Sequence, residues 1–248
     1  MDRKVVINTA KAHDGWGWYV CAWVLFSRNP GMWIALALIY MVMILVLAMG
    51  VPFIGGVVTS LVSPALLGGM MFAAREVELG RKLELSCLFK AFTDDTKTAP
   101  MIILGAITLG MWMVISMAMA FFFVGIFFDV FSESGFDPKN IDPELLLQMV
   151  SSVPFFIGTF VILSLWMVGV MATFYSPALV MLRGMDPFAA LITSFKAALK
   201  NWLPLLLVFF SISTALFIVA ALPFFLGLIL FFPIYFVATY CSYRTVFQ

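Results

Sequence analysis

Charged side chains are scarce in this sequence, and long stretches of it contain none. Asp, Glu, Lys and Arg together make up 11% of the 248 residues, whereas hydrophobic residues make up 64%. Soluble domains have about 25% charged and about 45–50% apolar residues, so this composition is typical of an integral membrane protein. The formal net charge of +1 gives no reason to expect a nucleic-acid partner.

Groups that carry out chemistry are equally scarce. The one histidine, His13, lies in a polar segment without an Asp, His or Cys constellation near it, and nucleophilic and metal sites need several convergent groups. Thioethers are soft ligands for Cu(I), and one apolar run holds four of them, Met111, Met113, Met117 and Met119. At helical spacing these side chains spread around a helix, where Met commonly fills packing gaps. We therefore expect no enzyme activity, no catalytic residues, and no cofactor or metal site.

Six apolar runs contain no Asp, Glu, Lys, Arg or His. They are 33–49, 53–74, 101–128, 153–182, 203–220 and 224–243. A helix needs about 20 residues to cross the hydrocarbon of a bilayer. We predict an all-α, polytopic membrane protein with six transmembrane helices in a single membrane domain, residues 1–248. Ion-coupled transporters keep ionisable groups inside the membrane, so the composition of these runs argues against ion-coupled transport.

Three segments beside the runs have the pattern of amphipathic helices that lie in the membrane interface. In the first, which begins at Asp14 and ends at Arg28-Asn29-Pro30, four aromatic residues share one helical face: Trp16, Tyr19, Trp23 and Phe26. The second lies within 75–99, where a similar spacing is found for Leu85, Leu88, Phe89 and Phe92. Residues 1–13, which precede the first helix, are predicted to form a frayed polar tail.

The third amphipathic segment has the clearest helix start, with Asp186 as the cap and Pro187 in the first turn. One face is predicted to hold Phe188, Leu191, Ile192, Phe195, Leu199 and Trp202, and the other Ser194, Lys196, Lys200 and Asn201. Basic side chains on such helices bind anionic lipid head groups. The candidate head-group contacts across the three segments are Arg28, Arg81, Lys82, Lys90, Lys196 and Lys200.

The order of an interfacial helix, a span, a turn and a second span occurs three times. Ser63-Pro64-Ala65-Leu66 recurs as Ser176-Pro177-Ala178-Leu179, and Phe89-Lys90-Ala91 recurs as Phe195-Lys196-Ala197. These short identities agree in position, which supports tandem duplication. We predict three parallel hairpin repeats, at about 14–74, 83–182 and 186–244, each with a cytoplasmic amphipathic helix before its hairpin. Candidate helix-packing residues are Gly55, Thr59, Ser63, Pro64 and Pro177.

Lys and Arg predict the orientation of the chain. Placing both termini in the cytoplasm puts 13 of the 14 basic residues inside and leaves only Lys139 outside. The loop 129–148 then lies outside with five acidic residues, Asp129, Glu133, Asp137, Asp142 and Glu144. It could bind cations or a basic partner, or form a solvated cap. Asp137-Pro138 and Asp142-Pro143 both place a capping Asp before a Pro, so at least one short helix is predicted to start there.

The same orientation places all three cysteines at the cytoplasmic boundary. Cys21, Cys87 and Cys241 show no CxxC signature, although a three-cysteine metal site remains geometrically open. Because the cytoplasm keeps thiols reduced, we expect free thiols and no structural disulfide.

Several motifs carry a resemblance to known proteins: Gly15-Trp16-Gly17-Trp18, the entry Phe26-Ser27-Arg28-Asn29-Pro30-Gly31-Met32-Trp33, and the two Ser-Pro-Ala-Leu copies. With the overall arrangement, they resemble a family of uncharacterised six-span inner-membrane proteins of Gram-negative bacteria. The chain is also distantly similar to the membrane domain attached to some glycerophosphodiester phosphodiesterases, but lacks the phosphodiesterase barrel with its metal-binding acids. The resemblance implies an inner-membrane location and no catalytic residues.

Two functional hypotheses follow. The first is a non-enzymatic membrane protein that organises lipid or a partner protein, with membrane lipids and another inner-membrane protein or a second copy as partners. The second is an uncoupled transporter or channel-like path for a small or lipidic solute. It predicts a shared polar cavity among Thr59, Ser63, Thr173, Ser176, Ser213 and Thr239.

Overall fold

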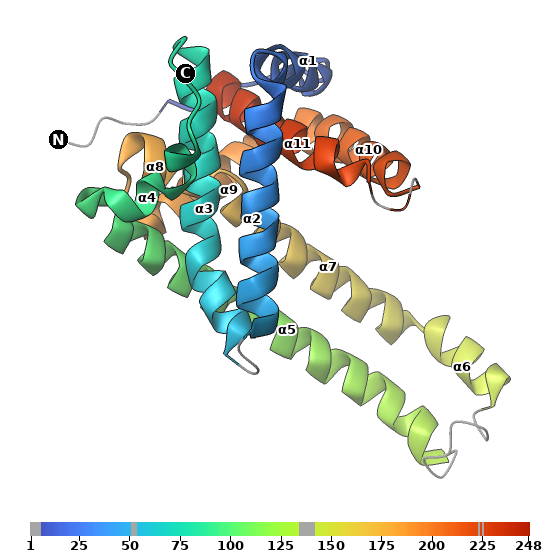
Figure 1. The fold of residues 1–248 in the computed structure, drawn as a ribbon. Helices are drawn as coiled ribbons and strands as arrows, with labels where there is room; N and C mark the ends of the chain where they lie inside the picture. Colours follow the sequence, from blue (N-terminus) through green and yellow to red (C-terminus); the bar gives the residue numbers. More distant parts are fainter. Residues whose placement is uncertain (1–5, 51–53, 134–141, 223, 225) are drawn as a thin grey trace. The chain divides into compact units, whose positions relative to one another are not determined.

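The computed structural model describes residues 6–50, 54–133, 142–222, 224 and 226–248, and these residues form helices and connecting loops without a strand (Figure 1). The helices of the first half are α1 (Asp14–Ser27), α2 (Pro30–Gly50), α3 (Gly55–Glu78), η1 (Leu85–Phe89), α4 (Lys90–Thr93) and α5 (Asp95–Glu133). Those of the second half are α6 (Pro143–Val150), α7 (Val153–Phe174), α8 (Ser176–Arg183), α9 (Pro187–Lys200), η3 (Leu203–Phe210), α10 (Ser211–Ala221) and α11 (Leu228–Phe247).

Six helical stretches are long and apolar enough to cross a membrane, as the sequence predicted. They are Pro30–Gly50, Gly55–Glu78, Asp95–Gly125, Val153–Arg183, Leu203–Ala221 and Leu228–Phe247. Several of them run past the apolar stretches that predict them. In particular, α3 continues to Glu78 and α11 continues to Phe247, so both end in residues that sequence reasoning placed outside the spans.

The chain divides into two compact units, one formed by the residues up to Thr108 and from Met171 onward, the other by Leu109–Val170. In the smaller unit, α7 packs closely on α5. A Cβ added at Gly158 would lie 1.8 Å from the Phe122 ring, and the rings of Phe122 and Phe155 lie 6.3 Å apart. A glycine at position 158 therefore permits this helix contact.

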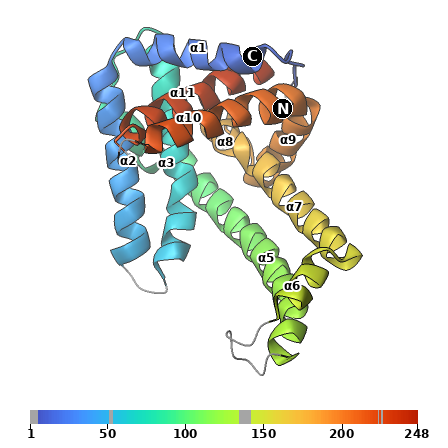
Figure 2. The ribbon, with the colours of Figure 1, turned by 90° about the vertical axis from the view of Figure 1, so that its right-hand side faces the viewer.

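The core of the larger unit is built from the second halves of α3 and α11 together with α8. Each of these segments starts at or beside a buried proline, Pro64, Pro233 or Pro177, and is almost continuously buried from there. α3 contacts both α8 and α11, and α1 contacts α11 and η3; Figure 2 shows α1 above α11. Arg183 at the end of α8 donates to the Tyr243 hydroxyl (3.1 Å) and to the Phe247 carbonyl, which fastens α8 to α11.

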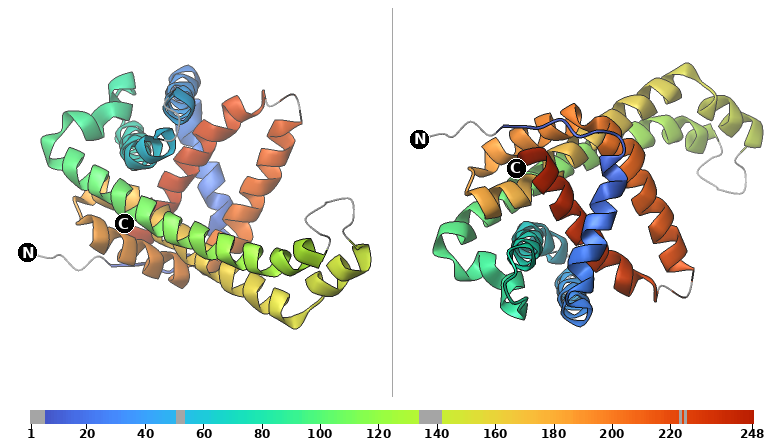
Figure 3. Two further views of the ribbon diagram at one scale, coloured as in Figure 1. Left: turned by 90° about the horizontal axis from the view of Figure 1, so that it is seen from below. Right: turned by 90° about the horizontal axis from the view of Figure 1, so that it is seen from above.

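The N-terminal segment is not frayed over the residues that the structure describes. The backbone N–H of Asn8 donates to the Val246 carbonyl (2.8 Å), and the N–H of Ala10 donates to Oδ1 of Asn201 (2.6 Å). The amide of Asn201 in turn donates to the Asn8 carbonyl (3.0 Å). The right-hand view of Figure 3 shows this segment leading into α1, which crosses α11.

The first amphipathic helix forms where it was predicted, but its aromatic residues do not share one environment. Tyr19 and Phe26 are buried in α1, whereas Trp16 and Trp23 are about 60% and 59% exposed. The prediction placed these four residues on one face because they are separated by three or four residues along the helix. The helix instead turns Tyr19 towards η3, where its ring stacks on Phe209 with the centroids 5.3 Å apart.

The second amphipathic segment is not one helix. α3 extends to Glu78, Gly80 follows in the left-handed region with φ of +74°, the short η1 and α4 come next, and α5 begins at Asp95. Leu88 is completely buried, and its carbonyl would lie 2.1 Å from a Cβ added at Gly69 of α3. Close contact with α3 therefore explains why Leu88 faces the protein interior.

The third amphipathic helix starts as predicted, because Asp186 accepts from the N–H groups of Phe188 (3.0 Å) and Ala189 (3.1 Å). Its polar face differs from the prediction. Ser194 and Asn201, placed on one face with Lys196 and Lys200, are buried, whereas the two lysines are exposed. On the apolar face Phe188, Ile192, Leu199 and Trp202 are exposed and Leu191 is buried. The buried polar groups serve the backbone of neighbouring segments, which periodicity alone does not reveal.

The predicted outer loop, 129–148, is partly helical. The backbone of α5 continues to Glu133, and α6 begins at Pro143 with the Asp142 carboxylate accepting from the Glu144 N–H (2.9 Å), as the Asp-Pro pair predicted. Asp137 and Lys139 lie outside the described residues.

Candidate functional site

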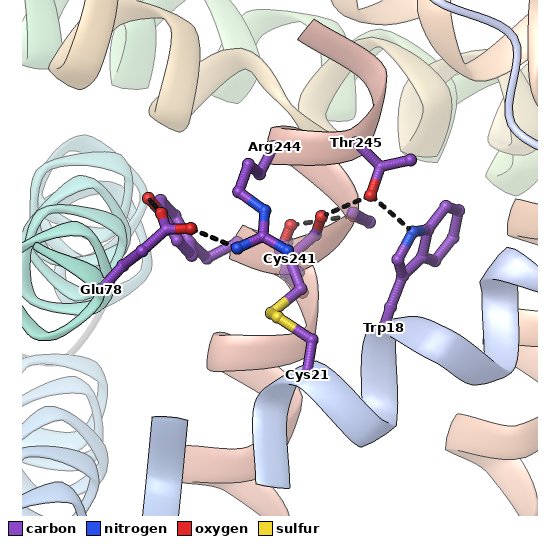
Figure 4. The surroundings of a disulfide bond; sticks show 9 residues. Trp18, Cys21, Glu78, Cys241, Arg244 and Thr245 are labelled. Atoms are coloured by element: carbon purple, nitrogen blue, oxygen red, sulfur yellow. Dashed lines mark hydrogen bonds and ion pairs between the residues drawn. A yellow bond between two sulfur atoms is a disulfide. The ribbon is translucent and has the colours of Figure 1, made fainter. Parts of the chain in front are cut away.

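A polar cluster joins the ends of α3 and α11. The Glu78 carboxylate accepts hydrogen bonds from the Tyr240 hydroxyl and the Arg244 guanidinium (Figure 4). The side chains of Glu78 and Arg244 are 25% and 40% exposed, so the ion pair is only partly screened by solvent. Arg28 adds a second cation nearby, and its guanidinium donates to the Val77 carbonyl (2.9 Å) at the end of α3.

The sequence of α11 places four functional side chains on two adjoining faces. Tyr240 and Arg244 are four residues apart and both reach Glu78. Residues at this spacing are neighbours on a helix surface. Cys241 and Thr245 have the same spacing, and both contact α1, through a disulfide to Cys21 and a hydrogen bond from Trp18 Nε1 to Thr245 Oγ1 (3.2 Å). Figure 4 shows the two sets of contacts side by side.

The disulfide between Cys21 and Cys241 corrects the expectation of three free thiols. Their Cα atoms lie 6.3 Å apart, across 220 residues of sequence. The prediction was wrong because it assigned the redox state from the compartment alone, whereas the packing of α1 on α11 brings these two residues together. A disulfide between two of the three cysteines also leaves no three-thiolate metal site.

Cys87 is the remaining free cysteine. It is buried in η1, and this burial raises the pKa of its thiol above the ordinary value. Its chemistry therefore differs from that of the disulfide-bonded pair.

A shallow pocket of about 210 Å³ lies beside the disulfide. It is lined by Asp14, Gly17, Trp18, Cys21, Cys241, Arg244 and Thr245. The pocket thus combines a carboxylate, a guanidinium, an indole and a disulfide. Such a site can receive a small molecule that carries both charges or that reacts with sulfur.

The predicted head-group residues occupy several positions along the described chain. Lys82, Lys196 and Lys200 are exposed, and Lys90 is half-buried at the start of α4. Three of the six residues contact other parts of the protein: Arg81 pairs with Glu76 (2.8 Å), Lys200 donates to the Ile7 carbonyl (2.6 Å), and Arg28 donates to the Val77 carbonyl. Nothing in the structure brings all six into one site.

The predicted packing residues lie on α3 and α8. Pro64 and Pro177 are buried, and a Cβ added at Gly55 would lie 2.5 Å from the Ala48 carbonyl oxygen of α2. Ser63 is half-buried, and the buried hydroxyl of Thr59 has no hydrogen-bond partner. Of these positions, Gly55 marks the closest backbone approach.

Three of the hydroxyls proposed for a solute path bond to backbone carbonyls three or four residues before them. Ser176, Ser213 and Thr239 donate to the carbonyls of Thr173, Phe209 and Tyr235 at 3.1, 2.8 and 2.9 Å, and the Ser213 hydroxyl also bonds the Tyr19 hydroxyl of α1 (2.5 Å). Hydroxyls in apolar helices commonly bond in this way. A solute could use these groups only by displacing those bonds.

Sequence reasoning missed the cluster of Glu78, Tyr240 and Arg244. It placed Cys21 and Cys241 at the same membrane boundary but did not pair them. The available signal was the equal distance from Pro64 to Arg75 and from Pro233 to Arg244, which marks equivalent ends of α3 and α11. Comparison of the chain with protein-family models, curated proteins and solved structures gave no match. The six apolar helices support an integral, multi-pass membrane protein.

Proposed function

We propose that this protein is a non-enzymatic component of the bacterial inner membrane that organises lipid or a partner protein. The observation that supports this proposal best is the outer surface of α9. Phe188 and Leu199 are 62% and 52% exposed there, Trp202 just after the helix is 49% exposed, and Lys196 and Lys200 are exposed on α9 itself. Apolar and basic side chains together favour the boundary between acyl chains and anionic head groups.

The other side of α9 holds this surface rigidly. Ala190, Ala197 and Ala198 are completely buried, and Ser194 and Asn201 are hydrogen-bonded to other segments. A helix fixed in this way presents its exposed residues without a large ordering cost on binding. α1 shows a similar arrangement, with exposed Trp16 and Trp23 opposite buried Trp18 and Ala22.

The proposed orientation has both termini in the cytoplasm, because this places 13 of 14 basic residues inside. The proposal also includes three tandem repeats. It is supported by the burial that follows Pro64, Pro177 and Pro233, one proline in each repeat. In this arrangement α1 and α9 lie at the cytoplasmic leaflet, where anionic lipids attract basic residues.

The lipid proposal can be tested by purifying the whole protein in a mild detergent and measuring the lipids and proteins that remain bound. We expect anionic phospholipids to be enriched relative to the membrane extract. Lys196→Gln combined with Lys200→Gln should reduce this enrichment severalfold. Lys139→Gln is the matched control, since it removes a basic residue assigned to the opposite face.

Retention of a defined protein in place of lipid would support the partner form of the proposal. The whole proposal fails if the wild type retains neither lipid above the bulk composition nor a partner. A twofold or smaller difference between the double variant and the Lys139 control would remove α9 as the binding surface.

A further inference from the structure

We infer that Cys21 and Cys241 form a thiol–disulfide exchange site that reacts with a small zwitterionic thiol. The inference rests on the proposed orientation of the chain and is independent of lipid binding. In that orientation the site faces the cytoplasm, where thiol systems keep most cysteines reduced and where disulfides are mainly transient, catalytic or redox-sensing. A disulfide at this face therefore calls for exchange chemistry.

The pocket gives a reagent access to the bond. Both cysteines line the cavity of about 210 Å³, and of the two Cys21 is half-buried whereas Cys241 is 1% exposed. Exchange begins when a thiolate attacks one sulfur of a disulfide, and access decides which sulfur is attacked. Cys21 is therefore the more accessible of the two residues.

Charges in the pocket favour both the reagent and the leaving group. Arg244 lies three residues after Cys241 on α11 and lines the same pocket, so its positive charge stabilises a thiolate at Cys241. Asp14 lines the pocket as well. Arg244 pairs with Glu78 through one Nη atom, and Asp14 accepts from the Lys11 N–H (2.6 Å) and lies 3.3 Å from His13 Nε2. A guanidinium has five N–H donors and each carboxylate oxygen accepts more than one bond, so a thiol that carries a carboxylate and an ammonium group can pair with both residues in addition, which a neutral thiol cannot do.

The reaction balances in two steps. An incoming thiolate forms a bond to Cys21 Sγ, the Cys21–Cys241 bond breaks, and Cys241 leaves as a thiolate that takes up a proton. A second thiolate then attacks the sulfur of the small thiol in the mixed disulfide, which releases Cys21 as a thiolate that is protonated in turn. Two small thiols are thereby oxidised to one disulfide, and the protein gains two electrons and two protons.

The test uses the whole protein in native membranes, in a Cys87→Ser variant that leaves only the two cysteines of the site. Membranes are equilibrated, without denaturant, with graded ratios of reduced to oxidised glutathione, a zwitterionic thiol. Exchange is stopped with acid, the protein is denatured, and its free thiols are labelled with a maleimide-linked polymer that shifts the protein on a gel. We expect reversible conversion between forms with no and two labelled thiols. In a Cys241→Ser, Cys87→Ser variant, oxidised glutathione should form a stable adduct at Cys21.

Neutral mercaptoethanol is the matched reagent. Glutathione should reduce the site several times faster than mercaptoethanol when both are compared at equal thiolate concentration, and Asp14→Asn should narrow that difference. Equal rates for the two reagents would overturn the zwitterionic specificity. A bond that yields to glutathione only after denaturation, or two thiols that stay free at every ratio, would overturn the exchange site itself.

Orientation is measured separately by labelling the reduced site with a membrane-impermeant maleimide. Reaction from the cytoplasmic face alone is the expected result, and reaction from the opposite face alone overturns the inference. Because these readouts count thiols and the lipid experiment counts bound lipid, failure of one proposal is distinguishable from failure of the other.

Discussion

The Ser194 hydroxyl of α9 takes the place of a backbone hydrogen bond that Tyr175 does not make within its own helix. It accepts from the Tyr175 N–H (2.9 Å) and donates to the Met171 carbonyl (2.8 Å), the partner that the N–H would have in a continuous α-helix. Two residues later Pro177 has no backbone N–H, and the chain passes from α7 to α8 here. A side chain of α9 thus supplies the hydrogen bonds that the Tyr175 N–H and the Met171 carbonyl lack at this helix break.

Replacing this hydroxyl should destabilise the protein. Ser194→Ala leaves the buried N–H and carbonyl without their partner, and such groups cost about 1–3 kcal/mol when unsatisfied. Thermal unfolding of the purified protein in detergent measures the loss. Thr193→Ala is the control, because it removes a hydroxyl about 100° around the same helix. If Thr193→Ala lowered the stability as much as Ser194→Ala, the role of Ser194 at the helix break would be contradicted.

Glycine 69 should be intolerant of even the smallest side chain. A Cβ there would lie 2.1 Å from the Leu88 carbonyl oxygen, so Gly69→Ala forces η1 away from α3 and should cost about 1–3 kcal/mol or more. Gly56 lies in the same helix with nothing within 4 Å of an added Cβ. Gly56→Ala should therefore be neutral or stabilising by up to about 1 kcal/mol. Unfolding of both variants in one detergent measures the contrast, and equal stability would show that the close contact is absent.

The pair formed by Glu78 and Arg244 should show energetic coupling. Glu78→Gln leaves the partly shielded guanidinium without its anion, and Arg244→Met leaves the carboxylate without its cation. Because both side chains keep some contact with solvent, we expect a coupling of about 1 kcal/mol. A double-mutant cycle on unfolding free energies measures it. Arg81 and Glu76 are the reference pair. The Arg81 side chain is 64% exposed, so its charge is better solvated than that of Arg244 and the coupling should be smaller.

Alkylation of Cys87 should depend on pH in a way that reports its burial. Burial favours the neutral thiol and raises its pKa, so the thiolate that reacts with maleimides or iodoacetamide is scarcer at a given pH than in an unfolded chain. The reaction rate in a Cys21→Ser, Cys241→Ser variant should rise with pH through a midpoint above that of the unfolded chain. The raised pKa also means that the associated stability is fully present below the unfolded pKa and is lost as pH rises through the folded one. A midpoint equal to or below that of the unfolded chain would contradict the raised pKa of Cys87.

The spans were predictable from sequence because the constraint is local and strong. A bilayer excludes charges over about 20 residues, and the six charge-free runs follow directly from that requirement. The helix starts at Asp142 and Asp186 were also predictable, since a capping carboxylate and a following proline act within three residues.

The cluster at the helix ends could not be read from sequence in the same way. Glu78 and Arg244 are 166 residues apart, and the disulfide joins positions 220 residues apart, so only the packing of α11 on α1 and α3 brings them together. Ser194 and Asn201 were assigned to the water face because periodicity equates polar with exposed. In the structure both side chains hydrogen-bond to the backbone of other segments, Ser194 to Tyr175 and Asn201 to Ala10. The sequence does not show these bonds, because they depend on the helix break at Tyr175 and on the position of the segment at Ala10.

The pairing of α1 with α11 also bears on how the protein is made. Helices enter the membrane in the order of their synthesis, and domains begin to fold while the chain is still growing. Cys21, Trp18 and Asn8 are joined to Cys241, Thr245 and Val246, so these contacts of α1 form only after the last helix has been translated. A chain interrupted before α11 would lack the disulfide and both of these hydrogen bonds, and its first helix would lose the largest part of its packing partner.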